Sequence, residues 1–328
     1  MQSNTTGLRT TELGATGMQI TRVGFGAWAI GGNGWEFGWG QQEDQESIDT
    51  IHRALELGVN WIDTAAAYGF GHSEEVVGRA IAGLDDRPYV FTKASLIPGP
   101  GGKVLHSLKR DSILREAEAS VRRLGVDAID LYQIHWPNPD ADIEEGWSAL
   151  AELKEQGLVR HIGVSNFDVD QLRRVEAIAP VETLQPQYSL IAREVEDDVL
   201  PFTRNAGIGV IAYSPMGSGL LTGAMTRERI ANLPEDDWRK RDERFVEPQL
   251  SAHLALVERL QAVAERHDST PGAVAAAWAL LNPAVHGAII GFRRPDQVDG
   301  VLDAGRLELS EADVADIEGA SSAGEKTA

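Results

Sequence analysis

The stretch Trp61-Ile62-Asp63-Thr64-Ala65-Ala66-Ala67-Tyr68-Gly69 ends a short apolar run in two polar side chains, Asp63 and Tyr68. Lys93 follows a second apolar run in the same way, and His135 follows a third. An acid, a phenol, an amine and an imidazole that are carried by successive buried strands form a set suited to proton transfer at a carbonyl. The pattern therefore predicts both a strand-built fold and an enzyme.

Apolar runs of this kind recur eight times from residue 23 to the last quarter of the chain. They alternate with segments whose apolar residues are spaced by three and four, for example Ile48, Ile51 and Leu55. Strand, helix, strand repeated eight times predicts parallel strands with right-handed crossovers, which close into an α/β (β/α)8 TIM barrel. A doubly wound open sheet is the competing architecture. The eight runs are Val23–Trp28, Asn60–Asp63, Tyr89–Lys93, Ala128–Trp136, Ile162–Asn166, Thr183–Gln187, Ile208–Ser214 and Ala288–Phe292.

Two segments lie outside this repeat. Arg9–Leu13 and Met18–Arg22 flank a glycine-containing turn and predict an N-terminal β-hairpin, placed to cap the barrel floor. Residues 217–251 are rich in glycine and then in charge, which predicts a long loop after strand 7 that is a lid or a binding loop, or else disordered. Since no linker or composition break is visible, we expect a single domain over residues 1–328, with 321–328 as a disordered tail.

The composition argues against several classes of partner. A net charge of −20 is unsuited to nucleic acid or an anionic membrane, because both require a cationic surface. The chain has no cysteine and no paired metal-ligand spacing among its histidines, so we expect no disulfide and no metal site. A polar N-terminus and the lack of a bilayer-length apolar run predict a cytoplasmic protein. We expect a monomer, because a closed barrel has no free sheet edge.

The four polar side chains at the strand ends suit the reduction of a carbonyl group. That reaction needs a hydride donor and an acid that protonates the developing alkoxide. A tyrosine, with an ordinary pKa of about 10, can donate this proton. We expect Lys93 to lower the pKa of Tyr68, Asp63 to hold Lys93, and His135 to orient the carbonyl oxygen. Each residue alone has a common structural explanation, so the prediction depends on all four sharing one face of the barrel.

The expected substrate pocket lies beside this set and is rich in aromatic residues. The segment Asn33–Trp39 forms a wall of the pocket or, equally well, a buried turn packed by its own tryptophans. The residues expected in the pocket are Trp28, Trp35, Tyr68, His135 and Trp136.

Short motifs lie at the ends of the apolar runs: Gly24-Phe25-Gly26-Ala27-Trp28, Ile62-Asp63-Thr64-Ala65, Tyr68-Gly69, Thr92-Lys93, Ile134-His135-Trp136-Pro137, Gly163-Val164-Ser165-Asn166-Phe167, Gln185 and Tyr213-Ser214-Pro215. Together they resemble the aldo-keto reductase family over nearly the whole chain. The catalytic tetrad of that family maps onto Asp63, Tyr68, Lys93 and His135.

The resemblance implies a nicotinamide cofactor bound along the same face of the barrel. It implies that Ser165, Asn166 and Gln185 bond the nicotinamide amide, that Tyr213 stacks on the ring and that Gly217–Leu221 lie along the pyrophosphate. The residues implied to bind the cofactor are Gly26, Ala27, Trp28, Asp63, Ser165, Asn166, Gln185, Tyr213, Ser214, Pro215, Gly217, Ser218, Gly219, Leu220, Gly291, Arg293, Arg294 and Gln297.

The family's adenosine 2′-phosphate site falls after the last strand, at Arg293 and Arg294. Because guanidinium groups bind phosphate bidentately, this pair favours NADPH/NADP+ over NADH. Many members carry an acidic residue and an asparagine that touch the adenine, where this chain has Gly300 and Val301. The Gly-Phe-Arg-Arg pattern looks closest to a bacterial branch that reduces small aldehydes or oxidises polyols such as glycerol.

Three functions follow as hypotheses. The first is an NADPH-dependent oxidoreductase that reduces aldehydes and ketones to alcohols, with a small carbonyl or alcohol as its substrate. The second is an NADPH-binding regulatory subunit similar to the potassium-channel β subunits. The third is an NADP-dependent polyol or sugar dehydrogenase that acts in the oxidative direction.

Overall fold

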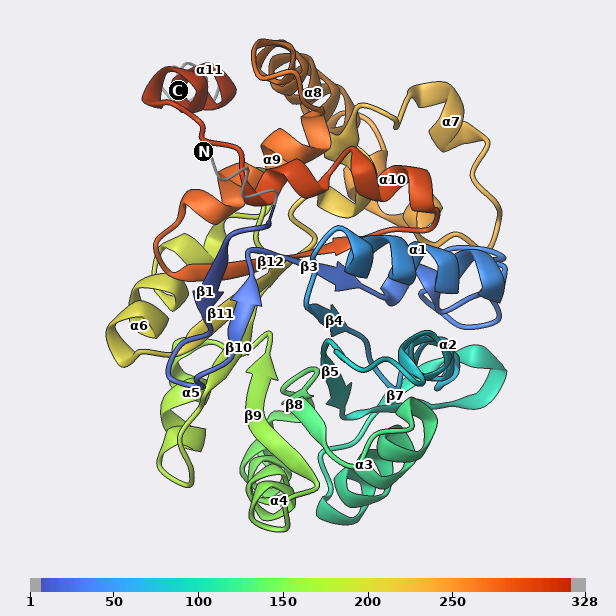
Figure 1. Ribbon diagram of the computed structural model, residues 1–328, viewed down its shortest axis with the longest axis vertical. Helices are drawn as coiled ribbons and strands as arrows, with labels where there is room; N and C mark the ends of the chain where they lie inside the picture. The colour runs from blue at the N-terminus through green and yellow to red at the C-terminus, as the bar shows by residue number, and fades with distance from the viewer. Residues whose placement is uncertain (1–6, 320–328) are drawn as a thin grey trace.

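The computed structural model describes residues 7–319, which form a closed barrel of eight parallel strands surrounded by helices (Figure 1). The strands follow one another around the barrel in chain order, so each of the eight predicted runs supplies one strand. The TIM-barrel prediction is confirmed. The barrel strands are β3 (Val23–Gly26), β4 (Trp61–Asp63), β5 (Tyr89–Ala94), β8 (Ile129–Ile134), β9 (Val159–Ser165), β10 (Thr183–Gln185), β11 (Gly209–Tyr213) and β12 (Val285–Gly291).

The helices cover the outer face of the barrel. Local sequence sets several of their ends: Asp168 and Gln171 form a capping box, and the side chain of Thr270 accepts a hydrogen bond from Ala273. The α-helices are α1 (Asp44–Glu56), α2 (His72–Ile81), α3 (Arg110–Leu124), α4 (Ile143–Glu155), α5 (Val169–Glu176), α6 (Val199–Ala206), α7 (Arg227–Ala231), α8 (Gln249–Arg266), α9 (Pro271–Leu281), α10 (Pro295–Asp299) and α11 (Glu311–Glu318). The short 3-10 helices are η1 (Trp28–Ile30), η2 (Pro100–Gly102), η3 (Asp140–Asp142), η4 (Glu194–Glu196), η5 (Gly217–Thr222), η6 (Trp238–Arg241), η7 (Glu243–Phe245) and η8 (Leu302–Gly305).

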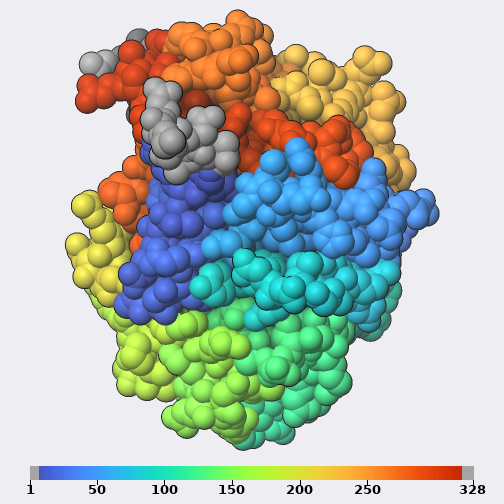
Figure 2. All heavy atoms as spheres, viewed as in Figure 1, coloured from blue at the N-terminus to red at the C-terminus, as the bar shows by residue number. Residues whose placement is uncertain are grey.

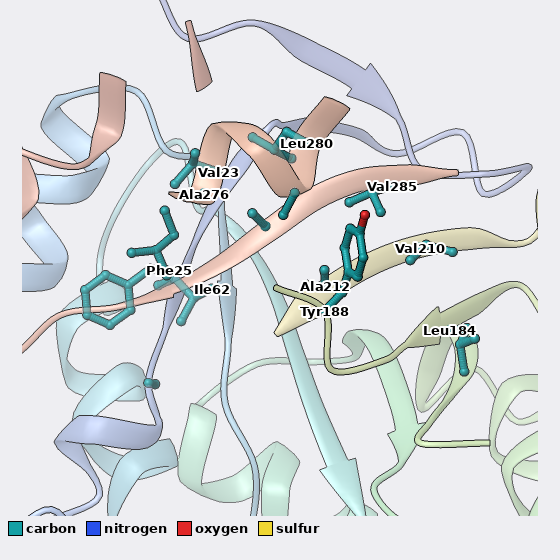
Figure 3. Packing of buried hydrophobic residues seen from close by; sticks show 14 of the residues in the cluster. Val23, Phe25, Ile62, Leu184, Tyr188, Val210, Ala212, Ala276, Leu280 and Val285 are labelled. Carbon is teal, nitrogen blue, oxygen red and sulfur yellow. The ribbon is translucent and has the colours of Figure 1, made fainter. Parts of the chain in front are cut away.

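The main hydrophobic core lies between the strands and these helices. Figure 3 shows Val23 and Val285 of the barrel packed near Ala276 and Leu280 of α9, all within one buried cluster. Figure 2 shows the first part of the chain, in blue, against the orange and red last part, as closure of the barrel requires. Within residues 7–319, no helix is long and apolar enough to cross a membrane.

The predicted N-terminal hairpin is present and closes the barrel floor. Its strands β1 (Thr10–Glu12) and β2 (Gln19–Thr21) are antiparallel. Leu13, Met18 and Ile20 pack against Trp61 and Phe91 in a separate apolar cluster. The hairpin leads into the start of β3. These apolar side chains therefore close the barrel at the N-terminal ends of its strands and leave the C-terminal ends open.

The barrel interior changes from apolar to polar along its axis. Side chains two residues apart on a strand point to the same side. Asp63 therefore follows the inward-facing Trp61, and Lys93 follows the inward-facing Phe91. The fold thus places charged groups above an apolar floor and near the open end.

The structure adds one hairpin that was not predicted and shows which form the long segment after β11 takes. A second hairpin, β6 (Leu96–Pro98) and β7 (Val104–His106), follows β5. Residues 217–251, predicted as a lid or binding loop or else as disordered, form an ordered segment that contains η5, α7, η6 and η7. A small core of its own packs this segment, formed by Leu220, Met225, Leu233, Phe245 and Leu250. The predicted tail, 321–328, lies outside the described residues.

Gly24 provides a test of the packing inside the barrel. A Cβ atom at Gly24 would lie 2.1 Å from the ring of Trp61, which is fully buried. We expect Gly24→Ala to lower the free energy of unfolding by about 1–3 kcal/mol, as overpacked core substitutions do. Urea denaturation measures this change. Gly7→Ala, where a Cβ atom meets nothing within 4 Å, is the control, and equal stability of the two variants would contradict the packing described here.

Candidate active site

A cavity of about 1270 Å³ opens at the C-terminal ends of the barrel strands. It extends from Tyr68 and His135 to Arg293 and Arg294, so it joins the predicted catalytic residues to the predicted phosphate site. The residues predicted for catalysis, substrate or cofactor that line it are Gly26, Ala27, Trp28, Trp35, Asp63, Tyr68, His135, Trp136, Ser165, Asn166, Tyr213, Ser214, Pro215, Ser218, Gly219, Gly291, Arg293, Arg294 and Gln297.

Four predicted residues are not part of the lining. Lys93 and Gln185 are buried behind it, where both bond the carboxylate of Asp63. Leu220 faces the small core of the segment after β11, and Gly217 packs against Ile191. The first two therefore act on the cavity through Asp63, while the last two shape the loop.

The centre of the site is a buried ion pair. Lys93 Nζ lies 2.5 Å from Asp63 Oδ1 and donates a second hydrogen bond, of 2.9 Å, to the carbonyl oxygen of Thr64. The third contact of the ammonium is the Tyr68 hydroxyl oxygen, at 3.4 Å. The second carboxylate oxygen of Asp63 accepts a 2.8 Å hydrogen bond from Gln185 Nε2. The ammonium is thus held between a carboxylate and a phenol.

Tyr68 is supplied by the turn after β4 and is enclosed by aromatic rings. Its ring centroid lies 5.6 Å from that of His135, in an edge-on arrangement, and 6.3 Å from that of Trp28, which stacks on it. Trp35 lies 6.1 Å away, centroid to centroid. Trp35 is itself buried, so it belongs both to a packed turn and to the cavity wall. Trp136 also lines the cavity, but its side chain is exposed.

The pKa of Tyr68 differs from the prediction. Burial raises it well above 10, and the charge of Asp63 acts in the same direction. The expected lowering by Lys93 is therefore outweighed in this structure, because desolvation of the phenolate is the larger effect. The phenol consequently keeps its proton at neutral pH, as a proton donor must.

His135 follows β8 and is also buried. Burial lowers its pKa well below 6.5, and the charge of Lys93 lowers it further. Among the described residues, its Nδ1 atom has no hydrogen-bond partner. A neutral imidazole beside Tyr68 can offer a hydrogen bond to an oxygen atom but is a poor source of a proton.

The strand ends opposite the tetrad are linked to one another. Asn166 Nδ2 donates to the carbonyl oxygen of His135 at 2.9 Å, and the Tyr213 hydroxyl donates to Asn166 Oδ1 at 2.9 Å. Ser165 Oγ donates to the carbonyl oxygen of Gln185 at 2.7 Å. Asn166 has a positive φ of 63°, which turns its side chain away from the strand direction and towards these neighbours.

The two predicted phosphate-binding arginines are not equivalent. Arg293 donates to Gln42 Oε1 at 2.8 Å and to the carbonyl oxygen of Trp39 at 2.7 Å, and Gln42 Nε2 donates back to the Arg293 carbonyl oxygen at 2.8 Å. Arg294 is half exposed and pairs with Asp296 at 3.0 Å. Arg293 therefore fastens the loop before α1, and Arg294 is the more accessible guanidinium of the two.

The structure adds residues that sequence reasoning missed. Trp238 stacks on Trp28 with centroids 5.1 Å apart, and Trp39 meets Trp28 edge-on at 5.4 Å. Arg239 lies 4.2 Å from the centroid of Trp39 and pairs with buried Asp237 at 2.6 Å. These contacts carry the segment after β11 across the cavity. In the sequence, these residues could have been found from Trp238, a tryptophan within a densely charged segment.

The cavity suits a dinucleotide. Its lining combines accessible Arg294, polar strand-end groups such as Ser165 and Asn166, and the positive-φ residues Ser218 and Gly219. A Cβ at Gly219 would have Arg239 Nη1 as its nearest neighbour, at 3.6 Å, so this backbone is open to the cavity beside a cation. Over residues 7–319, no group of three or more His, Asp or Glu side chains could hold a metal ion.

Comparison with known proteins agrees with these observations. The Aldo/keto reductase family matches residues 22–322. The aldo-keto reductase YhdN of Bacillus subtilis is 39% identical over 94% of this chain and 92% of the relative. The NADH-specific methylglyoxal reductase of Escherichia coli is 35% identical, over 92% of this chain and 94% of the relative.

Among solved structures, the glycerol dehydrogenase of Gluconobacter oxydans superposes with a TM-score of 0.87 at 37% identity. The superposition covers 98% of this chain and 97% of that one. The resemblance found in the motifs is confirmed, and the chain belongs to the aldo-keto reductase family. Its relatives include oxidoreductases, namely the methylglyoxal reductase and the glycerol dehydrogenase.

Proposed function

We propose that this chain is an NADPH-dependent oxidoreductase that reduces aldehydes and ketones to alcohols, with Tyr68 as the general acid. The observation that carries the proposal is the placement of a buried, protonated phenol within 3.4 Å of the ammonium of Lys93 and beside a neutral His135. A bound nicotinamide would supply the hydride. The residues described below supply the proton and the orientation.

Tyr68 and His135 face the same part of the cavity, so one carbonyl oxygen can meet both. Tyr68 gives its proton to the oxygen as negative charge develops there, while the neutral imidazole of His135 donates a hydrogen bond that orients it. The phenolate that remains lies 3.4 Å from Lys93 Nζ, whose positive charge stabilises it. Asp63 keeps the ammonium in place. The aromatic rings around Tyr68 keep its side chain buried.

Arg294 supports the preference for NADPH. Its half-exposed side chain lines the cavity, and a guanidinium binds a phosphate monoester through two hydrogen bonds. Arg293 contributes by holding the loop that carries Trp39. The Escherichia coli relative is described as NADH-specific, so the preference needs a direct test on this chain.

The same groups can serve the reverse reaction. Tyr68 as a phenolate would accept the proton of an alcohol, which makes NADP+-dependent oxidation of a polyol the second candidate. The similarity to a glycerol dehydrogenase supports polyol oxidation as this second candidate. Assays with a panel of small aldehydes and polyols, each with both cofactors, distinguish the two directions.

Tyr68→Phe removes the proton donor and keeps the ring. We expect kcat for carbonyl reduction to fall by about 10²- to 10⁴-fold, while the affinity for NADPH stays within twofold, roughly the error of such measurements. Stopped-flow NADPH oxidation and NADPH fluorescence titration measure the two quantities. Tyr89→Phe, at the start of β5 and far from the cavity lining, is the matched control. Normal turnover of Tyr68→Phe would refute the acid role.

Arg294→Ala should separate the two cofactors. A hydrogen-bonded charge pair is worth about 1.5–3 kcal/mol, so we expect KM for NADPH to rise about 10- to 100-fold and KM for NADH to stay nearly constant. Asp296→Asn, which frees Arg294 from its partner, should instead leave KM for NADPH unchanged or lower. An equal rise for both cofactors in Arg294→Ala would show that Arg294 does not read the 2′-phosphate.

A further inference from the structure

Three barrel strands are followed directly by a residue other than glycine that has a positive φ. Asn166 follows β9 with a φ of 63°, Ser214 follows β11 with 54°, and Ser95 follows β5 with 86°. Residues with a side chain rarely adopt this conformation, and those that do are concentrated at functional sites. Asn166 and Ser214 line the cavity, which accounts for them. Ser95 does not line it, and the reaction described above gives it no role.

Every polar group of Ser95 is paired, although the residue is completely buried. Its backbone N–H donates to Glu116 Oε2 at 3.1 Å, and its carbonyl oxygen accepts from the Ser107 N–H at 3.0 Å. Its hydroxyl donates to the carbonyl oxygen of Trp136 and accepts from the Trp136 N–H, each at 3.3 Å. An unfavourable backbone conformation persists only where its surroundings fix it, and these four bonds do so.

The bonds to Trp136 fix the chain just after β8, where His135 lies. The His135 N–H donates to the carbonyl oxygen of Ala94, the residue before Ser95, at 3.0 Å. From the other side, Asn166 Nδ2 bonds the His135 carbonyl oxygen. Among the described residues, no protein group bonds His135 Nδ1. The position of the imidazole therefore follows from the backbone that carries it and from the rings that surround it.

Ser95 also closes the base of the hairpin formed by β6 and β7. It directly precedes β6, and its partner Ser107 directly follows β7. Leu96 and Val104 of this hairpin line the cavity and pack with Tyr68 in one apolar cluster. Ser95 thus joins the end of β8 to the hairpin that borders Tyr68.

Glu116 of α3 fixes Ser95 from outside the barrel. Its Oε2 atom accepts the Ser95 N–H, and its Oε1 atom accepts a 3.1 Å hydrogen bond from Ser112 Oγ. Burial raises the pKa of Glu116 to about 8, and the charge of Glu74 acts in the same direction, against the two hydrogen bonds and the charge of Arg123. The neutral acid therefore predominates at pH 7, and both forms present an oxygen atom to the Ser95 N–H. Glu116 acts here as an acceptor and needs no charge.

We propose that Glu116 and Ser95 are positioning residues that hold His135 in place. Glu116 fixes the Ser95 amide, and the Ser95 hydroxyl fixes the backbone of Trp136 beside the imidazole. A displacement of about 1 Å at a reacting group can cost about 10²-fold in rate, so a small shift of this strand end is enough to slow the reaction. The effect on turnover rests on the proposed function, because it requires His135 to orient the carbonyl, whereas the effect on the backbone does not.

The first test compares crystal structures of the full chain and does not depend on turnover. Ser95→Ala removes the hydroxyl, and Glu116→Met replaces the acceptor of the Ser95 N–H by a side chain of similar length. In both variants we expect the backbone at His135 and Trp136 to move by about 0.5–1 Å from its wild-type position. In Glu116→Gln, whose amide oxygen can still accept, it should not move. An unmoved backbone in Ser95→Ala and Glu116→Met would overturn the proposal, even if the chain reduced no carbonyl compound.

The second test measures the effect on the reaction at pH 7. We expect kcat for carbonyl reduction to fall by about tenfold in Ser95→Ala and in Glu116→Met, and Glu116→Gln to restore most of the rate lost in Glu116→Met. The affinity for NADPH, measured by fluorescence titration, should not change, because neither residue lines the cavity. Glu118→Met and Glu118→Gln are the matched controls on α3. Since Glu118 is exposed and its partner is the surface residue Arg122, both should keep the wild-type kcat.

Ser95→Gly separates positioning from folding. Glycine adopts a positive φ without steric cost, so this variant keeps the backbone conformation accessible while it lacks the hydroxyl. We expect its kcat to fall as in Ser95→Ala, and melting temperatures of all variants identify any loss that comes from unfolding. If Glu116→Met does not fold, the two Ser95 variants decide. A wild-type kcat in both Ser95 variants, or equal losses in folded Glu116→Met and Glu116→Gln, would overturn the proposal.

Discussion

The buried ion pair of Lys93 and Asp63 is the interaction on which the rest of the site depends. Both side chains are almost completely buried, and each compensates for the desolvation of the other. The ammonium reaches the Tyr68 hydroxyl, and the carboxylate reaches Gln185 across the barrel. Three strands, β4, β5 and β10, are thus tied to one pair of charges, and the apolar floor below keeps that pair away from solvent. The position of the proton donor follows from this arrangement.

Much of this architecture could be predicted from local sequence. The eight apolar runs identified the barrel strands, because a buried parallel strand must be apolar on both faces. Polar side chains directly after such runs had to meet at one end of the barrel, and Tyr68, Lys93 and His135 do so. The helix caps at Asp168 and Thr270 followed from hydrogen bonds between near neighbours.

What could not be predicted depends on contacts between distant segments. The bond from Arg293 to the carbonyl oxygen of Trp39 joins residues 254 positions apart, and no local pattern indicates it. The stacking of Trp238 on Trp28 likewise requires the path of the segment after β11. The balance of effects on the pKa of Tyr68 also needed the structure, because burial and a nearby ammonium act in opposite directions and only coordinates decide which is larger.

The pH dependence of kcat for carbonyl reduction tests the central claim most directly. Burial raises the pKa of Tyr68, so the acid form persists and the rate should stay level through neutral pH and fall only in the alkaline range. Burial lowers the pKa of His135, so no transition should occur near the ordinary histidine value of about 6.5. A rate that rises as the pH falls through that value would identify a histidine as the proton donor and contradict the account.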